Sequence, residues 1–162
     1  MTLSSSSLSA DAGLVCGCPC GAVEYTIHGA PLLRGYCHCT ICQSFNQAPF
    51  ADITVFHADD VALPDEASVD YRTFRPPPAV QRGVCRACGK PAVEYIKLPL
   101  MPKLIVVPSL NIRQLERIPA PALHVFYHRR QADVADALPK YQGYLASQTA
   151  FLGRIALRLR RR

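Results

Sequence analysis

"CPCGAVEYTI" (residues 18–27) and "CRACGKPAVEYI" (residues 85–96) repeat one pattern: a cysteine pair, a glycine, a short spacer and then Ala-Val-Glu-Tyr. Each segment predicts a metal-binding turn that leads into a β-strand, in which Gly21 or Gly89 permits the tight backbone after the second cysteine. Two such turns facing each other would form a closed site of four thiolates and would stabilise the fold by joining distant parts of the chain. The ligands of this structural site would be Cys18, Cys20, Cys85 and Cys88.

A second group of thiols lies in "GYCHCTICQ" (residues 35–43), where Cys37, Cys39 and Cys42 have chelating spacing. Three protein ligands with one exchangeable position are typical of catalytic zinc, so we expect an open three-thiolate site here. Cys16 leaves two alternatives. It would close this site as a fourth ligand, or it would be a spare thiol of the first turn.

His38 stands between two of these ligands, so its side chain is expected to point away from the metal. It is the candidate catalytic residue, as a proton-transfer group or as a support for the ligands. The alternative is a solvated surface position.

The metal itself is inferred from the number and grouping of the cysteines. Eight of them fall in three clusters, a pattern that isolated, inert buried cysteines would not produce. Two zinc ions are the interpretation we favour. Iron–sulfur ligation, which also uses cysteine-only sets, stays open at this point.

Charge and hydropathy exclude several classes of protein. The net charge is +6, but five arginines after residue 153 contribute +5, which leaves +1 for the rest of the 162-residue chain. The body therefore gives no ground for a nucleic-acid-binding domain. Residues 1–12 lack the features of a secretory signal and predict a flexible lead, and no apolar run approaches the ~20 residues of a membrane span. We expect a soluble, cytoplasmic protein, in which thiols serve as metal ligands more often than as disulfides.

The body, residues 13–142, is expected to be a single mainly β domain. Short runs rich in Val, Ile, Tyr and Phe are separated by Gly, Pro and Asp, as strands are. "CTICQSFN" (residues 39–46) predicts a short helical turn around the second metal. The predicted strands are residues 22–27, 49–58, 68–74, 92–98, 103–110 and 123–130.

Residues 143–162 predict a basic amphipathic helix. Helical spacing places five apolar residues on one face and arginines opposite. Three interpretations remain: the helix docks on the body or on a second subunit, it lies on an anionic membrane, or it is a solubilising or polyanion-binding tail. Because no ligand lies in this segment, we also expect it to be dispensable for folding. The apolar residues are Leu145, Leu152, Ile155, Ala156 and Leu159.

In order and spacing, the motifs over residues 14–142 resemble the glutathione-dependent formaldehyde-activating enzyme family, which includes the centromere protein V domain. The resemblance implies a zinc-containing β-tent fold, a structural zinc on the four-cysteine set and a second zinc on the three-cysteine set. It also implies condensation of formaldehyde with glutathione, classed as a carbon–sulfur lyase by the reverse reaction. The matching segments are "CPCGAVEY", "YCHCTICQ", "APF" (48–50), "YRTF" (71–74), "CRACGKP", "PALH" (121–124) and "DALPKY" (136–141).

Two functions therefore compete. The first is a zinc-dependent enzyme that acts on an adduct of glutathione or another small thiol with formaldehyde or a similar carbonyl. The second is a zinc-stabilised binding module without turnover, whose basic C-terminal helix reaches a membrane, a polyanion or a protein.

Overall fold

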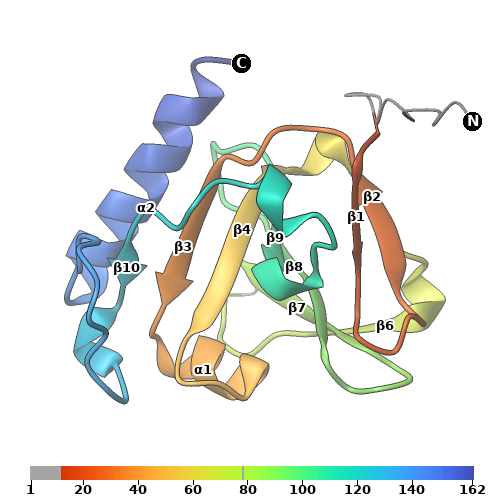
Figure 1. Ribbon diagram of the computed structural model, residues 1–162, viewed down its shortest axis with the longest axis horizontal. Helices are drawn as coiled ribbons and strands as arrows, with labels where there is room; N and C mark the ends of the chain where they lie inside the picture. The colour runs from red at the N-terminus through yellow and green to blue at the C-terminus, as the bar shows by residue number, and fades with distance from the viewer. Residues whose placement is uncertain (1–11, 78) are drawn as a thin grey trace, which may run out of the picture.

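Ten strands and two α-helices make up a mainly β protein in the computed structural model, which describes residues 12–77 and 79–162 (Figure 1). The predicted lead lies, except for its last residue, outside the described residues. Seven strands form the larger sheet, in which every neighbouring pair is antiparallel except β10 with β3. In spatial order they are β10 (His124–Val125), β3 (Leu33–Cys37), β4 (Ala51–His57), β9 (Leu104–Pro108), β8 (Pro91–Ile96), β7 (Val80–Cys85) and β6 (Val69–Arg72).

A smaller antiparallel sheet covers one face of the larger one. Side chains alternate along a strand, so the two faces of the large sheet belong to two separate apolar clusters. Phe56 and Ile105 pack with Tyr25 of the small sheet, whereas Val55 and Val106 pack on the opposite face. The strands of the small sheet are β1 (Leu14–Gly17), β2 (Glu24–Ile27) and β5 (Val61–Ala62).

Most of the sequence prediction is confirmed. Each expected strand overlaps an observed one, and the predicted helical turn is α1 (Thr40–Asn46). The segment 123–130 is wrong in extent, because Phe126 adopts a left-handed backbone conformation (φ 54°) and Tyr127–Arg129 form a 3-10 turn, which ends β10 after two residues. Strands β1, β3, β5 and β7 were not predicted.

The C-terminal helix is α2 (Tyr144–Leu159), and it docks on the body beside β10 and β3 (Figure 1). The residues of α2 that face the body recur at every fourth position, and two of them, Ser147 and Ile155, are fully buried. The hydroxyl of Ser147 accepts a 2.8 Å hydrogen bond from the backbone N–H of Phe126. The predicted apolar face is confirmed at Ile155, which belongs to the core, and at Leu159, which packs against it, but is wrong at Leu145 and Ala156, which are exposed.

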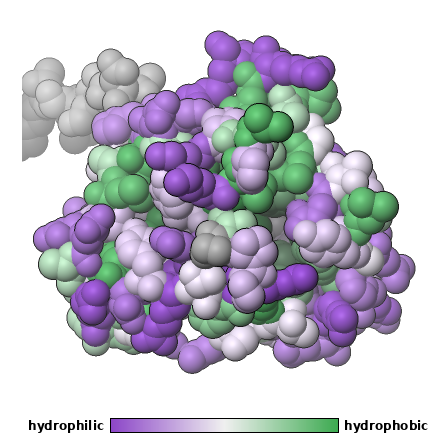
Figure 2. All heavy atoms as spheres, turned by 180° about the vertical axis from the view of Figure 1, so that it is seen from behind, coloured by the Kyte–Doolittle hydropathy of each residue, from purple (hydrophilic) through white to green (hydrophobic). Residues whose placement is uncertain are grey.

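The arginines after residue 157 lie at the free end of this helix. Seen from behind, hydrophilic side chains gather where the chain ends (Figure 2). In the part of the chain that the structure describes, neither helix is long and apolar enough to cross a bilayer.

Candidate functional site

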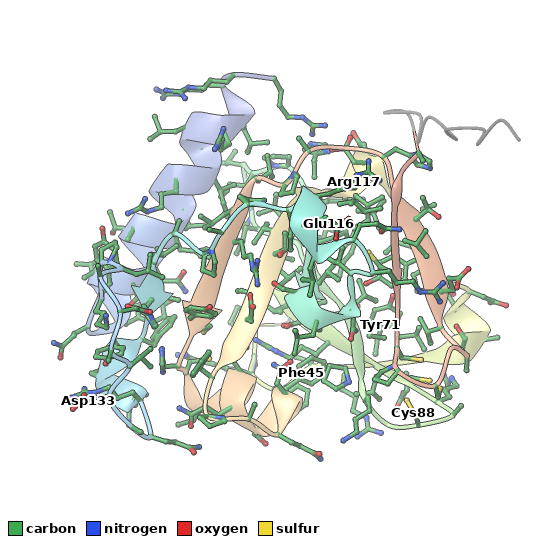
Figure 3. All side chains as sticks on the ribbon, viewed as in Figure 1. Phe45, Tyr71, Cys88, Glu116, Arg117 and Asp133 are labelled. Atoms are coloured by element: carbon green, nitrogen blue, oxygen red, sulfur yellow. The ribbon has the colours of Figure 1, made fainter. Side chains whose placement is uncertain are left out.

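The four cysteines of the repeated motif converge. Their sulfur atoms all lie within 4.8 Å of one another, with 3.3 Å between Cys18 and Cys20 and 3.7 Å between Cys20 and Cys85. Tetrahedral ligation with bonds of about 2.3 Å would separate sulfurs by about 3.8 Å, so the set fits a single metal ion. Figure 3 shows Cys88 and neighbouring sulfur atoms where the turn after β1 meets the turn after β7.

The two turns that carry these thiols have matching backbones. The N–H of Cys18 donates to the carbonyl of Val23, and the N–H of Cys85 donates to the carbonyl of Lys90, five residues on in each case. Gly21 and Gly89 both adopt left-handed φ angles, +78° and +68°, which a side chain would oppose. The repeat seen in the sequence is therefore a repeat of structure.

The second set of cysteines comes from one short stretch where β3 passes into α1. Cys37 ends β3, Cys39 caps the helix and accepts a bond from the N–H of Cys42, and the three sulfurs lie within 4.8 Å of one another. Hydrogen bonds from the thiol of Cys37 and then that of Cys42 lower the pKa of Cys39 to about 3. The cluster thus favours a thiolate and, through it, a cation.

Cys16 lies outside both sulfur clusters of the described residues. It is fully buried in the core between the two sheets, where burial raises the pKa of its thiol to about 12. A thiol held neutral by an apolar core is a poor ligand. This placement matches the alternative in which Cys16 is spare.

A buried ion pair lies against the three-cysteine cluster, and the sequence did not predict it. Arg82 and Glu94 are partners across β7 and β8, with 2.8 Å between the guanidinium Nε and the carboxylate Oε2. The Nη2 of Arg82 lies 4.0 Å from the sulfur of Cys42. Burial raises the pKa of Glu94, whereas the charge of Arg82 opposes that rise. The Glu of Ala-Val-Glu-Tyr was the available signal, but its burial could not be read from the motif.

His38 belongs to a buried hydrogen-bond chain. Its Nε2 lies 2.9 Å from Nδ1 of His124, whose Nε2 lies 2.8 Å from Oδ2 of Asp136. Lys140 bonds the other oxygen of Asp136, and together with His124 it lowers the pKa of that carboxyl to about 2. Asp136 is therefore an acceptor, which makes His124 donate from Nε2 and accept from His38 at Nδ1.

This assignment leaves the Nδ1 of His38 as an unprotonated acceptor. The atom is buried and has no hydrogen-bond partner among the described residues. The ring packs against Phe50 and Tyr127, and burial is the main cause that lowers the pKa of His38 to about 4. His38 is thus no surface residue. The other two members of this hydrogen-bond chain, His124 and Asp136, come from the "PALH" and "DALPKY" segments. The sequence did not indicate what their side chains do.

An open groove of about 470 Å³ is lined by residues of α1, the helix that carries Cys42, and of the loop after it. Thr40 and Gln43, which directly follow two of the cysteines, form one wall, and Gln47 and Gln131 extend it. Gln131 donates to the side-chain oxygen of Gln43 at 3.3 Å. The lining is mixed, with the amides of three glutamines beside Ala48 and Pro49.

The model of the glutathione-dependent formaldehyde-activating enzyme family matches residues 14–129, which include both cysteine clusters and the buried ion pair. The chain belongs to this family. Among solved structures, the chain is similar to a Rhodobacter sphaeroides protein, with 18% identity and a TM-score of 0.50 over 62% of this chain and 88% of the other. That likeness concerns the fold alone. No curated protein sequence matches the chain.

Proposed function

We propose that this member of the family is a zinc-dependent enzyme of the carbon–sulfur lyase type, acting on an adduct of glutathione, or of another small thiol, with formaldehyde or a similar carbonyl. The observation that carries the proposal is the three-cysteine cluster, a ligand set with no fourth cysteine among the described residues. Family membership supports the reaction class.

Zinc, bound by Cys37, Cys39 and Cys42, would supply an exchangeable position that favours the thiolate form of the substrate. A second zinc on the four-cysteine set would be structural. In the reaction the thiolate sulfur forms a bond to the carbonyl carbon, the carbon–oxygen π electrons move to oxygen, and that oxygen takes up the proton lost by the thiol. The reverse reaction breaks the same carbon–sulfur bond.

The protein's own groups would bind the rest of the thiol and handle its proton. The amides of Gln47 and Gln131 line the groove and can pair with the peptide groups of glutathione. The amide of Gln43 instead donates to the carbonyls of His38 and Arg129 and shapes the groove. His38 is the proposed proton carrier, because its Nδ1 is a neutral acceptor oriented by His124 and Asp136. The backbone N–H of His38 also donates to the carbonyl of Val125. This bond and the hydrogen-bond chain of the side chains together fix the peptide between Cys37 and Cys39.

The cellular setting is part of the proposal. All eight cysteines are free, and metal sites built on thiolates need reduced thiols. A cytoplasmic location, in which glutathione is abundant, fits that chemistry.

The test is an exchange measurement by NMR between hydrated formaldehyde and S-hydroxymethylglutathione. We expect the protein to accelerate exchange above the spontaneous rate, Cys42→Ser to return it to that rate, and Cys16→Ala, the matched cysteine outside both clusters, to keep the acceleration. Equal rates with and without the zinc-loaded protein would contradict the proposal.

The rival function is a binding module without turnover. The exposed arginines at the end of α2, Arg158, Arg160 and Arg161, favour it, because they project from the docked helix. A polyanion or an anionic membrane would be the partner. Binding of anionic vesicles that is lost when these arginines become glutamine, without any acceleration of the exchange above, would favour the module.

A further inference from the structure

We propose that Arg82 is a positioning residue of the three-cysteine site, and that its guanidinium, oriented by Glu94, lets this site take the substrate thiol as an anion. The inference rests on the proposed function and names a group that the family motifs did not identify. Its basis is the placement of two buried charges beside the cluster.

The ion pair has a defined direction. The Nε of Arg82 lies 2.8 Å from Oε2 of Glu94, an ion pair without hydrogen-bond geometry, while Nη2 lies 4.0 Å from the sulfur of Cys42. The guanidinium is therefore the group of this pair that contacts the cluster. Three thiolates around a divalent ion carry a net charge of −1, and an anionic thiol makes it −2, so a nearby cation offsets the charge that the substrate adds.

Neighbouring side chains hold Arg82 in this orientation. Its guanidinium carbon lies 6.0 Å from the ring centre of Phe45 and 5.8 Å from that of Phe74, and the two rings meet edge to face. Phe45 comes from α1, the helix that carries Cys42 (Figure 3). The guanidinium is thus restrained by β8, by α1 and by the loop after β6.

Stability alone does not explain this pair. Buried ion pairs stabilise a fold weakly, because desolvation offsets their attraction, and Oε1 of Glu94 is buried without a hydrogen-bond partner among the described residues. A purely structural pair would be expected to satisfy that oxygen. The repeat supplies the contrast, because Glu24, the equivalent of Glu94 in the first motif, is exposed and pairs with Arg113 at the surface.

The test is the affinity of the cobalt-loaded protein for glutathione, read from thiolate-to-metal absorption, with metal content and thermal unfolding measured on the same samples. Arg82→Met should keep two metal ions and weaken glutathione binding by about tenfold or more, as expected for loss of a charge-assisted contact. Arg82→Lys should restore part of the affinity. Glu94→Gln should weaken binding less, because the guanidinium stays but is no longer fixed.

The controls are matched to each change. Arg72 is the cross-strand neighbour of Arg82 on β6, it is exposed, and it pairs with Asp70, so Arg72→Met should leave binding unchanged. Glu24→Gln is the control for Glu94→Gln. If Arg82→Met does not fold, Arg82→Lys and Glu94→Gln decide the question by the same titration.

Two failures can be told apart. A wild-type protein that shows no change with glutathione contradicts the proposed function itself and this inference with it. The other outcome is that the wild-type protein binds glutathione, and that Arg82→Met and Glu94→Gln bind it equally well and lose only thermal stability. That outcome overturns the inference alone and shows that the ion pair is structural.

Discussion

The Nε2 atom of His38 lies 2.9 Å from the Nδ1 atom of His124, and the centroids of the two rings are 5.1 Å apart. This contact joins the end of β3 to β10, two strands that are 86 residues apart in the sequence. Because His38 separates two cysteines of the cluster, the pair fixes the backbone from which their sulfurs converge. The position of the ligands thus depends on a contact outside the cluster.

Substitution of His124 should therefore affect both stability and metal binding. His124→Asn breaks a buried hydrogen-bond chain and should lower the free energy of unfolding by about 1–3 kcal/mol. We also expect weaker metal binding at the three-cysteine site, measured by competition with a chelator. His28→Asn, at an exposed histidine, is the control. Unchanged stability and metal affinity in His124→Asn would show that this hydrogen-bond chain supports neither the fold nor the metal ligands.

The lowered pKa of His38 predicts a pH dependence. The folded protein keeps this ring neutral down to about pH 4, whereas the unfolded chain takes up a proton near pH 6.5. The contribution of His38 to stability is therefore complete above pH 6.5 and is lost as the pH falls toward 4. The ring proton resonances of His38, followed by NMR, should show their midpoint near pH 4. A midpoint near 6.5 would mean that the ring is hydrated.

The docking of α2 revises the expectation that the helix is dispensable. Ile155 is fully buried in the second apolar cluster, and Ile155→Ala should lower the free energy of unfolding by about 2–5 kcal/mol. Leu157→Ala, on the outer face of the same helix, should change it little. Chemical denaturation measures both. Equal small effects would restore the interpretation of a separable tail.

The cysteines should differ in what their loss does. Cys88→Ser should release one zinc and lower stability strongly, because its cluster joins turns some seventy residues apart and structural zinc binding is folding free energy. Cys42→Ser should release or weaken one zinc while the fold survives, since its cluster closes only a short loop. Cys16→Ala should keep both zinc ions. Zinc stoichiometry and thermal unfolding report the outcome, and a zinc lost in Cys16→Ala would mean that Cys16 is a ligand.

The sequence was informative wherever function depends on local spacing. The three-cysteine set, the glycines that turn the chain and the short helix at Thr40 all follow from residues that are close together, and the four-cysteine set follows from the repeat of one motif at residues 18–27 and 85–96. Apolar runs located the strands that have both faces buried, such as β4 and β9, because such strands lack polar interruptions.

What the sequence missed depends on contacts between distant segments. Glu24 and Glu94 stand in identical motifs, but only the second is buried, because β8 lies inside the large sheet and β2 lies in the small one. The pairing of His38 with His124 and Asp136 requires β10 to lie beside β3. In α2, the docking face includes the buried Ser147, which was missed because a hydropathy pattern excludes a polar residue.

The central claim is that the three-cysteine cluster binds a metal and keeps a position for a thiol. The most direct measurement is the absorption of the cobalt-substituted protein as glutathione is added. We expect two cobalt ions per chain and a glutathione-dependent increase in thiolate-to-metal absorption that disappears in Cys42→Ser and persists in Cys16→Ala. Two bound ions and an unchanged spectrum at millimolar glutathione would contradict the claim.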